Sequence, residues 1–212
     1  MAHVGDATLA DIHEYILLIS NRVMEKQAKP KFKGFRRPKR DFPYITRTYR
    51  PFTSPASISV SLSPALSVVW DSSIASLRYA YPTSMQMSGE KNREENRKQI
   101  LYMESANVPF SFIRGQKIDF KGYDLIDGNP EFIYQVGKIK VREKISLGKT
   151  AKSFVRHFII SGLALNGDNE RISLDLNHQK HANIKVSKGT LTNNILQLTA
   201  TEAAEFSVEV SL

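Results

Sequence analysis

The sequence of 212 residues contains no cysteine. Disulfide bonds, thiolate nucleophiles and zinc sites with cysteine ligands are therefore excluded, and a reducing compartment is favoured. There is also no apolar run near the roughly 20 residues that span a membrane. The short run 16–19 lies between Glu14 and Arg22, and no basic segment precedes it. We therefore expect no export signal, no membrane contact and a cytoplasmic or virion location.

The motifs of common enzyme classes are missing as well. The sequence has no G-x-S-x-G elbow, no G-x-x-x-x-G-K-[ST] phosphate loop and no G-x-G-x-x-G turn. His178 and His181 have an H-x-x-H spacing, but no third ligand is evident and Lys180 lies between them. The acidic turn at 124–131 lacks the spacing of a calcium loop. We therefore predict a non-enzymatic protein without catalytic residues, metal or cofactor.

Positive charge, in contrast, is concentrated in one segment. The chain has a net charge of +9. Between Lys26 and Pro51, ten lysines and arginines accompany a single acid, Asp41, so this segment alone carries nine net positive charges. The other residues hold 20 basic and 20 acidic side chains. An acidic partner would therefore be attracted to this segment rather than to the remainder of the chain.

Prolines and aromatic residues interrupt the same basic segment. The prolines exclude a continuous helix, so we expect an arm or linker without regular structure over residues 28–56. Its cations could bind phosphates or acidic side chains, and its aromatic rings could stack on bases or fill pockets of a neighbouring protein. The predicted partner-binding or nucleic-acid-binding residues are Lys29, Lys31, Phe32, Lys33, Phe35, Arg36, Arg37, Lys39, Arg40, Phe42, Tyr44, Arg47, Tyr49 and Arg50.

An amphipathic helix is predicted before the arm, at about residues 8–27 of an N-terminal unit spanning 1–27. Thr8 provides an N-cap, with Asp11 three residues later. Apolar residues then recur at steps of three and four, the spacing of one helical face. Such a face must be buried against its own body or against a partner subunit. The predicted docking face consists of Leu9, Ile12, Ile16, Ile19 and Val23.

Residues 57–212 are predicted to form a β-rich body. Apolar residues alternate with serines from Ser57 onward, which indicates a half-buried strand. Short strands separated by turn signals continue to the C-terminus, and this pattern favours an antiparallel sandwich or barrel-like body. Asn166-Gly167 suggests a hairpin that would pair residues 154–165 with 171–176. The expected strands are 57–62, 67–70, 74–81, 110–114, 117–123, 132–135, 138–147, 154–165, 171–176, 183–187, 195–199 and 206–210.

Two stretches of the body leave alternatives open. The charged segment 89–99 fits a short helix or a long exposed loop equally well. In the strand 138–147, basic residues share one face and apolar residues the other, with Glu143 interrupting the apolar row. This basic face could bind nucleic acid or a partner, or it could be the solvent face of an edge strand. The basic residues are Lys138, Lys140, Arg142 and Lys144.

Two functions fit these features. The first is a structural assembly subunit of the virion or tail type, an oligomer whose helix and basic arm dock on copies of itself or on neighbouring subunits. The alternative is a nucleic-acid-binding protein whose arm binds RNA or DNA phosphates. A solvated linker ranks third, because free linkers rarely hold six aromatic residues in about 21 positions.

Overall fold

The computed structural model describes residues 41–47, 50–85, 93–163, 171–179 and 181–212. The chain divides into two compact units, Met1–Lys39 and Arg40–Leu212, and all described residues belong to the second. The predicted N-terminal helix and its docking face lie outside the described residues. None of the described helices combines the length and the apolar character of a membrane span.

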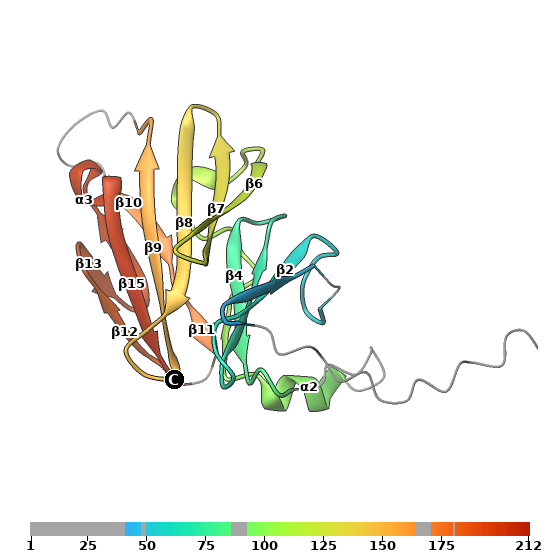
Figure 1. Cartoon of the computed structure of the whole chain (residues 1–212). Coiled ribbons are helices and arrows are strands. Elements are labelled where there is room, and N and C mark those ends of the chain that lie inside the picture. The colour runs from blue at the N-terminus through green and yellow to red at the C-terminus, as the bar shows by residue number, and fades with distance from the viewer. Residues whose placement is uncertain (1–40, 48–49, 86–92, 164–170, 180) are drawn as a thin grey trace, which may run out of the picture. The chain divides into compact units, whose positions relative to one another are not determined.

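Two six-stranded sheets and one three-stranded sheet make up the Arg40–Leu212 unit (Figure 1). All pairings between the strands are antiparallel. Sheet A has the order β1 (Tyr44–Thr46), β2 (Ser57–Ser61), β3 (Ser67–Asp71), β4 (Ser76–Tyr81), β5 (Tyr102–Glu104) and β11 (His178–Gln179). Sheet B has the order β10 (Ile172–Asp175), β14 (Ile195–Leu198) and β13 (Thr190–Thr192). Sheet C has the order β12 (Asn183–Val186), β15 (Glu205–Ser211), β9 (Ser153–Ser161), β8 (Ile139–Leu147), β7 (Asn129–Val136) and β6 (Asp119–Ile126).

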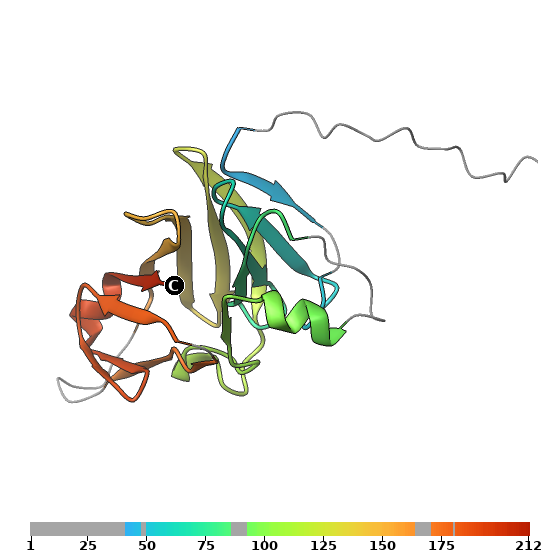
Figure 2. The ribbon, with the colours of Figure 1, turned by 90° about the horizontal axis from the view of Figure 1, so that it is seen from below.

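The prediction of a mainly β, antiparallel body is confirmed, but its barrel-like alternative is wrong. Among the described strands, sheet A ends at β1 and β11 and sheet C ends at β12 and β6, so neither sheet closes on itself. Seen from two directions, the strands of sheet A lie beside β6–β8 of sheet C (Figures 1 and 2). The architecture is therefore sandwich-like.

All three sheets contribute side chains to one hydrophobic core. Between sheets A and C, the Trp70 ring stacks on Phe132 with 4.3 Å between the ring centroids. Phe110, which forms a β-bridge with Leu174 of sheet B, packs edge-on against Phe158 of sheet C at 5.5 Å. Within sheet C, Phe158 stacks on Phe206 at 4.8 Å. Aromatic pairs add to the burial of apolar area, so these contacts stabilise the packing of the sheets.

Local sequence signals explain several of the elements. Asp127 and Gly128 both have positive φ, 52° and 75°, as the two central residues of a type I′ turn require, and they join β6 to β7. The Thr199 hydroxyl accepts a hydrogen bond from the Glu202 amide at 3.2 Å, and the Glu202 carboxylate accepts one from the Thr199 amide at 2.8 Å. This capping box starts the short helix α3 (Ala200–Ala204). The charged segment 89–99 was predicted to form either a short helix or an exposed loop. The helix is confirmed as α2 (Arg93–Gln99).

Two elements differ from the sequence-based prediction. The hairpin pairing is wrong, because β9 has β8 and β15 on its two sides in sheet C, whereas β10 pairs with β14 in sheet B. Asn166 and Gly167 themselves lie outside the described residues. The strand predicted at 110–114 is instead a 3-10 helix, η2 (Ser111–Ile113). Phe110 and Ile113 are both buried, and one 3-10 turn brings residues three apart to the same side.

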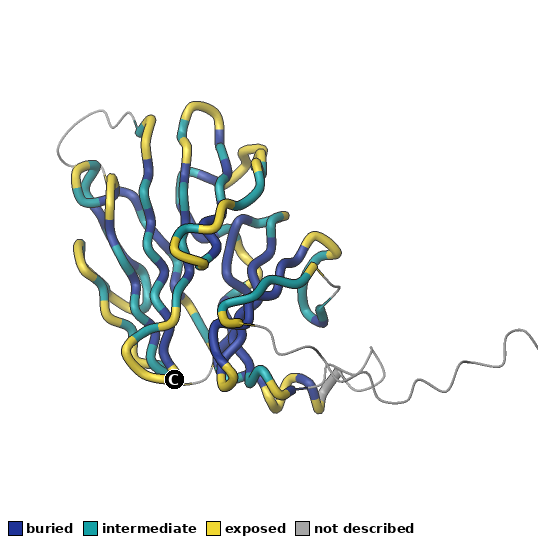
Figure 3. Tube along the Cα trace, in the orientation of Figure 1, coloured by how far each residue is buried: buried dark blue, intermediate teal, exposed yellow. Residues whose placement is uncertain are grey.

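The strands β2, β3 and β4 of sheet A are buried on both faces, which the alternation of apolar residues and serines did not predict. Every residue of β2, β3 and β4 is buried (Figure 3). The inner face of sheet A joins the common core. The outer face carries a second apolar cluster, which Phe52 covers in part. This second cluster consists of Val69, Tyr79, Tyr81, Met85, Ile100 and Met103.

Candidate functional site

Most of the predicted arm residues cannot be placed. Phe42, Tyr44, Arg47 and Arg50 are described, and all four lie near the body. The prediction that residues 28–56 lack regular structure is wrong for Tyr44–Thr46, which form β1 and pair with β2 at the edge of sheet A. The predicted binding residues outside the described part are Lys29, Lys31, Phe32, Lys33, Phe35, Arg36, Arg37, Lys39, Arg40 and Tyr49.

The two arginines after β1 lie over aromatic rings of the body. The Arg47 guanidinium carbon is 5.5 Å from the centre of the Tyr123 ring in β6, and that of Arg50 is 5.5 Å from the Tyr81 ring in β4. Such cation–π contacts are worth about 0.5–1 kcal/mol at exposed sites. These two predicted binding residues are therefore engaged within their own chain.

Beyond Arg50 the chain crosses the outer face of sheet A, and we call residues 50–54 the strap. Phe52 packs on the second apolar cluster, and its carbonyl accepts a hydrogen bond from Arg78 Nη2 at 3.4 Å. The strap ends at Ser54, whose amide and hydroxyl donate to the Asp71 carboxylate at 2.7 Å and 2.6 Å. The strap therefore attaches the end of the arm to β3 and β4.

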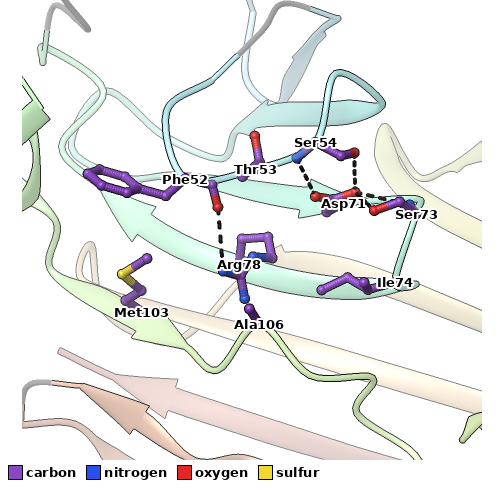
Figure 4. Close-up of a pocket in the computed structure, with 9 residues that line it drawn as sticks. All are labelled: Phe52, Thr53, Ser54, Asp71, Ser73, Ile74, Arg78, Met103 and Ala106. Carbon is purple, nitrogen blue, oxygen red and sulfur yellow. Dashed lines mark hydrogen bonds between the residues drawn. The ribbon is translucent and has the colours of Figure 1, made fainter. Parts of the chain in front are cut away.

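A pocket of about 410 Å³ lies where the strap meets β3, β4 and the end of β5 (Figure 4). Its wall combines apolar side chains with one cation, one anion and several hydroxyl groups. The lining residues are Phe52, Thr53, Ser54, Asp71, Ser73, Ile74, Arg78, Met103 and Ala106.

Arg78 is the positive charge of this pocket, although the residue is only 5% exposed. Its guanidinium donates to three backbone carbonyls: those of Glu104 at 3.2 Å, Phe52 at 3.4 Å and Ser105. Burial lowers the pKa of Arg78 below its ordinary value, although the charges of Asp71 and Glu104 act in the opposite direction. Neutral carbonyls thus solvate this guanidinium.

Asp71 is the negative charge of the pocket. Besides the two hydrogen bonds from Ser54, its carboxylate accepts from the Ser73 amide at 3.0 Å and the Ser73 hydroxyl at 2.7 Å. Burial raises the pKa of Asp71, but these four hydrogen bonds outweigh burial and hold the pKa below its ordinary value. Asp71 is therefore ionised at neutral pH, and its charge fixes the strap to the β3–β4 turn.

Hydroxyl pairs continue the polar part of the outer face of sheet A. The Ser59 hydroxyl bonds that of Tyr81 at 2.6 Å, and the Ser67 hydroxyl bonds those of Ser61 at 2.9 Å and Thr83 at 2.8 Å. Buried hydroxyl groups are tolerated when they are hydrogen-bonded. Ser59, Ser61 and Ser67 of the serine-rich segment 54–76 therefore belong to a buried network.

A second group of charges lies between sheets A and C and is sealed from solvent. Arg156 Nε donates to Glu143 Oε1 at 2.6 Å, and Arg156 Nη1 donates to Glu104 Oε1 at 2.8 Å. Trp70 Nε1 donates to Glu143 at 2.9 Å, and the Tyr102 hydroxyl donates to Glu104 at 2.9 Å. We call Glu104, Glu143 and Arg156 the buried ionic triad; their side chains are at most 3% exposed.

The triad contains one more acid than base. Burial raises the pKa of Glu104 above its ordinary value, and the charge of Glu143 raises it further, although Arg156 attracts the charged form. Burial alone would lower the pKa of Arg156, but the two carboxylates outweigh burial and raise it. Arg156 is thus paired with two carboxylates, whereas Glu104 and Glu143 share one guanidinium.

The basic residues of β8 lie on a central strand of sheet C. The edge-strand explanation is wrong, because β8 lies between β7 and β9. On the outer face of sheet C, Arg142 Nε donates to Glu131 at 2.8 Å, and His157 Nε2 lies 3.3 Å from a Glu205 carboxylate oxygen. This face therefore carries charges of both signs.

Of the histidine pair, His178 makes contacts within the fold, and His181 is exposed. His178 lies in β11, and one of its ring nitrogens is 2.9 Å from the Leu176 carbonyl oxygen. The His178 ring also lies against Tyr102, with 5.1 Å between the ring centroids. Within the described part of the chain, no group of three or more His, Asp or Glu side chains could hold a metal ion.

Comparison of the chain with protein-family models, with curated proteins and with solved structures gives no match. A function must therefore be argued from the chain itself.

The sequence contained partial signals for the charges of sheet C, but few for the pocket. Glu143 interrupts an apolar row in β8, and Arg156 stands between Phe154 and Phe158 in β9. A charge on an apolar strand face indicates a buried ionic partner. Arg78 and Asp71 have no such signal, because their pocket depends on a strap from a distant part of the sequence.

Proposed function

We propose that this chain is a non-enzymatic assembly subunit, of the virion or tail type, whose N-terminal helix and basic arm dock on neighbouring subunits. The attachment of the arm to the body carries this proposal. β1 and the strap hold the end of the arm on sheet A. Arg47 and Arg50 lie over rings of the body, whereas the other eight basic residues of the segment precede β1.

An arm attached in this way suits assembly because its end next to the body is held at a defined position on sheet A. A binding segment tethered at a defined point meets a neighbouring site at a high effective concentration. The predicted apolar helix before the arm needs a surface for burial, and a neighbouring subunit supplies one. Localisation in the cytoplasm or in a virion remains part of the proposal.

The alternative is that the arm binds single-stranded RNA or DNA. The aromatic rings among the upstream cations favour this alternative, because bases stack on aromatic faces while lysines and arginines neutralise phosphates. Phe32 and Phe35 are the rings nearest to Arg36 and Arg37 in sequence.

The decisive experiment removes residues 1–39 only, since a deletion extending into residues 41–54 would also remove β1 and the strap. We expect light scattering over a concentration series to show oligomers for the full chain and monomers for the truncated chain. Circular dichroism and thermal unfolding of both chains provide the control for the fold. A full chain that stays monomeric at the highest concentration would rule out self-assembly.

A charge-matched pair of variants separates protein docking from nucleic-acid binding. The arm variant replaces Arg36, Arg37, Lys39 and Arg40 by serine. The body variant replaces the exposed Lys117, Lys149, Lys152 and Lys188 by serine. If the arm binds nucleic acid, only the arm variant weakens the affinity for a fluorescent single strand, and the affinity of the full chain falls steeply between two salt concentrations. Equal losses in both variants would indicate nonspecific attraction.

A further inference from the structure

The pocket beneath the strap contains Arg78, and the charges of Asp71 and Glu104 act on this arginine without being in ion-pair contact with it. In the described part of the chain, Arg78 forms no ion pair with a carboxylate. The Glu104 carboxylate accepts hydrogen bonds from Arg156 and Tyr102, and the Asp71 carboxylate accepts four from Ser54 and Ser73. The acids nearest to Arg78 are therefore committed to other donors.

The guanidinium of Arg78 also retains donors. Of its five N–H groups, two on Nη1 serve the carbonyls of Glu104 and Ser105, and one on Nη2 serves that of Phe52. Nε and the second N–H of Nη2 have no acceptor among the described residues. Guanidinium N–H groups match the oxygen atoms of a carboxylate, and charge-assisted hydrogen bonds are about twice as strong as neutral ones.

The remainder of the lining is suited to a short apolar group. Phe52, Ile74 and Met103 supply apolar side chains around Arg78, and the exposed Ala106 lies at the end of β5 (Figure 4). Small-molecule sites typically combine such apolar walls with a few polar groups that fix orientation.

We propose that this pocket binds a carboxylate that carries a short aliphatic tail, with the carboxylate on Arg78 and the tail against Phe52, Ile74 and Met103. The carboxylate can belong to a free small acid or to an acidic side chain of another protein; the chemistry is the same. This site does not require a second subunit, so a chain that proves to be monomeric leaves the proposal intact.

The test is a titration of the full chain, followed by NMR or calorimetry, with hexanoate and with hexan-1-ol. The alcohol has the same tail without the charge. We expect hexanoate to bind at least about tenfold more tightly than the alcohol, because only the acid forms charge-assisted hydrogen bonds. Arg78→Gln should remove this preference. Equal binding of the two probes, or no binding of hexanoate, would overturn the proposal.

A second pair of variants covers the case in which Arg78→Gln fails to fold. Ala106→Phe fills the pocket and leaves Arg78 with its carbonyl partners, so hexanoate affinity should fall about tenfold or more. Ala151→Phe makes the same change at an exposed position in the β8–β9 connection and should leave the affinity unchanged. Hexanoate binding that survives Ala106→Phe unaltered would place the acid elsewhere and refute the assignment. A short peptide with blocked termini and a single glutamate distinguishes the two sources. If it competes with hexanoate, the pocket accepts an acidic side chain of another protein; if only free acids compete, the ligand is a small molecule.

Discussion

Arg156 and Arg78 are both buried arginines, but their charges are balanced in different ways. Arg156 has no exposed side-chain surface and two carboxylates at 2.6 Å and 2.8 Å. Arg78 is solvated by three carbonyl oxygens and lines a pocket. The first arginine joins two sheets, whereas the second joins the strap to sheet A.

This difference distinguishes a charge that stabilises the fold from a charge that is able to bind a ligand. A buried guanidinium that is paired with carboxylates has little to gain from a ligand. A guanidinium held by neutral carbonyls keeps its full charge, and an anion that reaches it replaces no existing ion pair. The four predictions that follow test this contrast, from the largest expected effect to the smallest.

Arg156→Met should have the largest effect. It leaves Glu104 and Glu143 buried without a cation, and the loss of one partner from a buried ion pair costs about 3–5 kcal/mol. Urea unfolding followed by circular dichroism measures the change. The matched control combines Arg156→Met with Glu104→Gln and Glu143→Gln, which keeps neutral acceptors for Tyr102 and Trp70 and should recover most of the loss. An unchanged unfolding midpoint in Arg156→Met would contradict the role of the triad.

Arg78→Met should destabilise the chain less than Arg156→Met. The three carbonyls lose their donor, at a cost of about 1–3 kcal/mol, but the adjoining pocket admits water to replace it and no carboxylate is left unpaired. The same urea titration gives the comparison. A loss equal to that of Arg156→Met would show that Arg78 also balances a buried charge.

Ser54→Ala tests the end of the strap. It removes the 2.6 Å hydrogen bond to Asp71 and should lower the free energy of unfolding by about 0.5–1.5 kcal/mol. The pKa of Asp71 should rise toward its ordinary value of 3.8, so the variant should lose less stability than the parent chain as the pH falls below 3.8. Ser72→Ala, which removes a bond from an exposed hydroxyl to the Ala56 carbonyl, is the control and should have a smaller effect.

Glu104→Gln should alter the pH dependence of stability. Because its pKa is raised in the folded chain, folding favours the protonated acid, and the free energy of unfolding falls as the pH rises from 4.5 through the folded pKa. The glutamine variant should lack this decline in urea titrations over that range. Glu95→Gln, at an exposed position of α2, should retain it. A decline that persists in Glu104→Gln would assign the effect to another group.

The strand content was predictable because apolar and polar residues alternate along the long strands. β8 and β9 each alternate between a core face and an outer face, and their expected positions agree with the structure to within a few residues. The triad could have been anticipated in part from Glu143 and Arg156, since each is a charge on an apolar face. Their meeting with Glu104 depends on the packing of sheet A against sheet C.

The outer face of sheet A was not predictable from local pattern. Serines at 57, 59 and 61 resemble a solvent-facing row, yet all three are buried. β1 is three residues long, too short for its periodicity to distinguish it from an extended arm. Tertiary contacts, rather than propensity, determine both features.

The position of β1 has a mechanical consequence. A pull on the residues upstream of Arg40 would reach the body first through the β1–β2 hydrogen bonds at the edge of sheet A. Tension that peeled β1 from β2 would next act on the strap, where Arg78 and Asp71 hold Phe52 and Ser54. The arm and the core are thus connected in series by two short attachments that can yield one after the other while the sandwich remains folded.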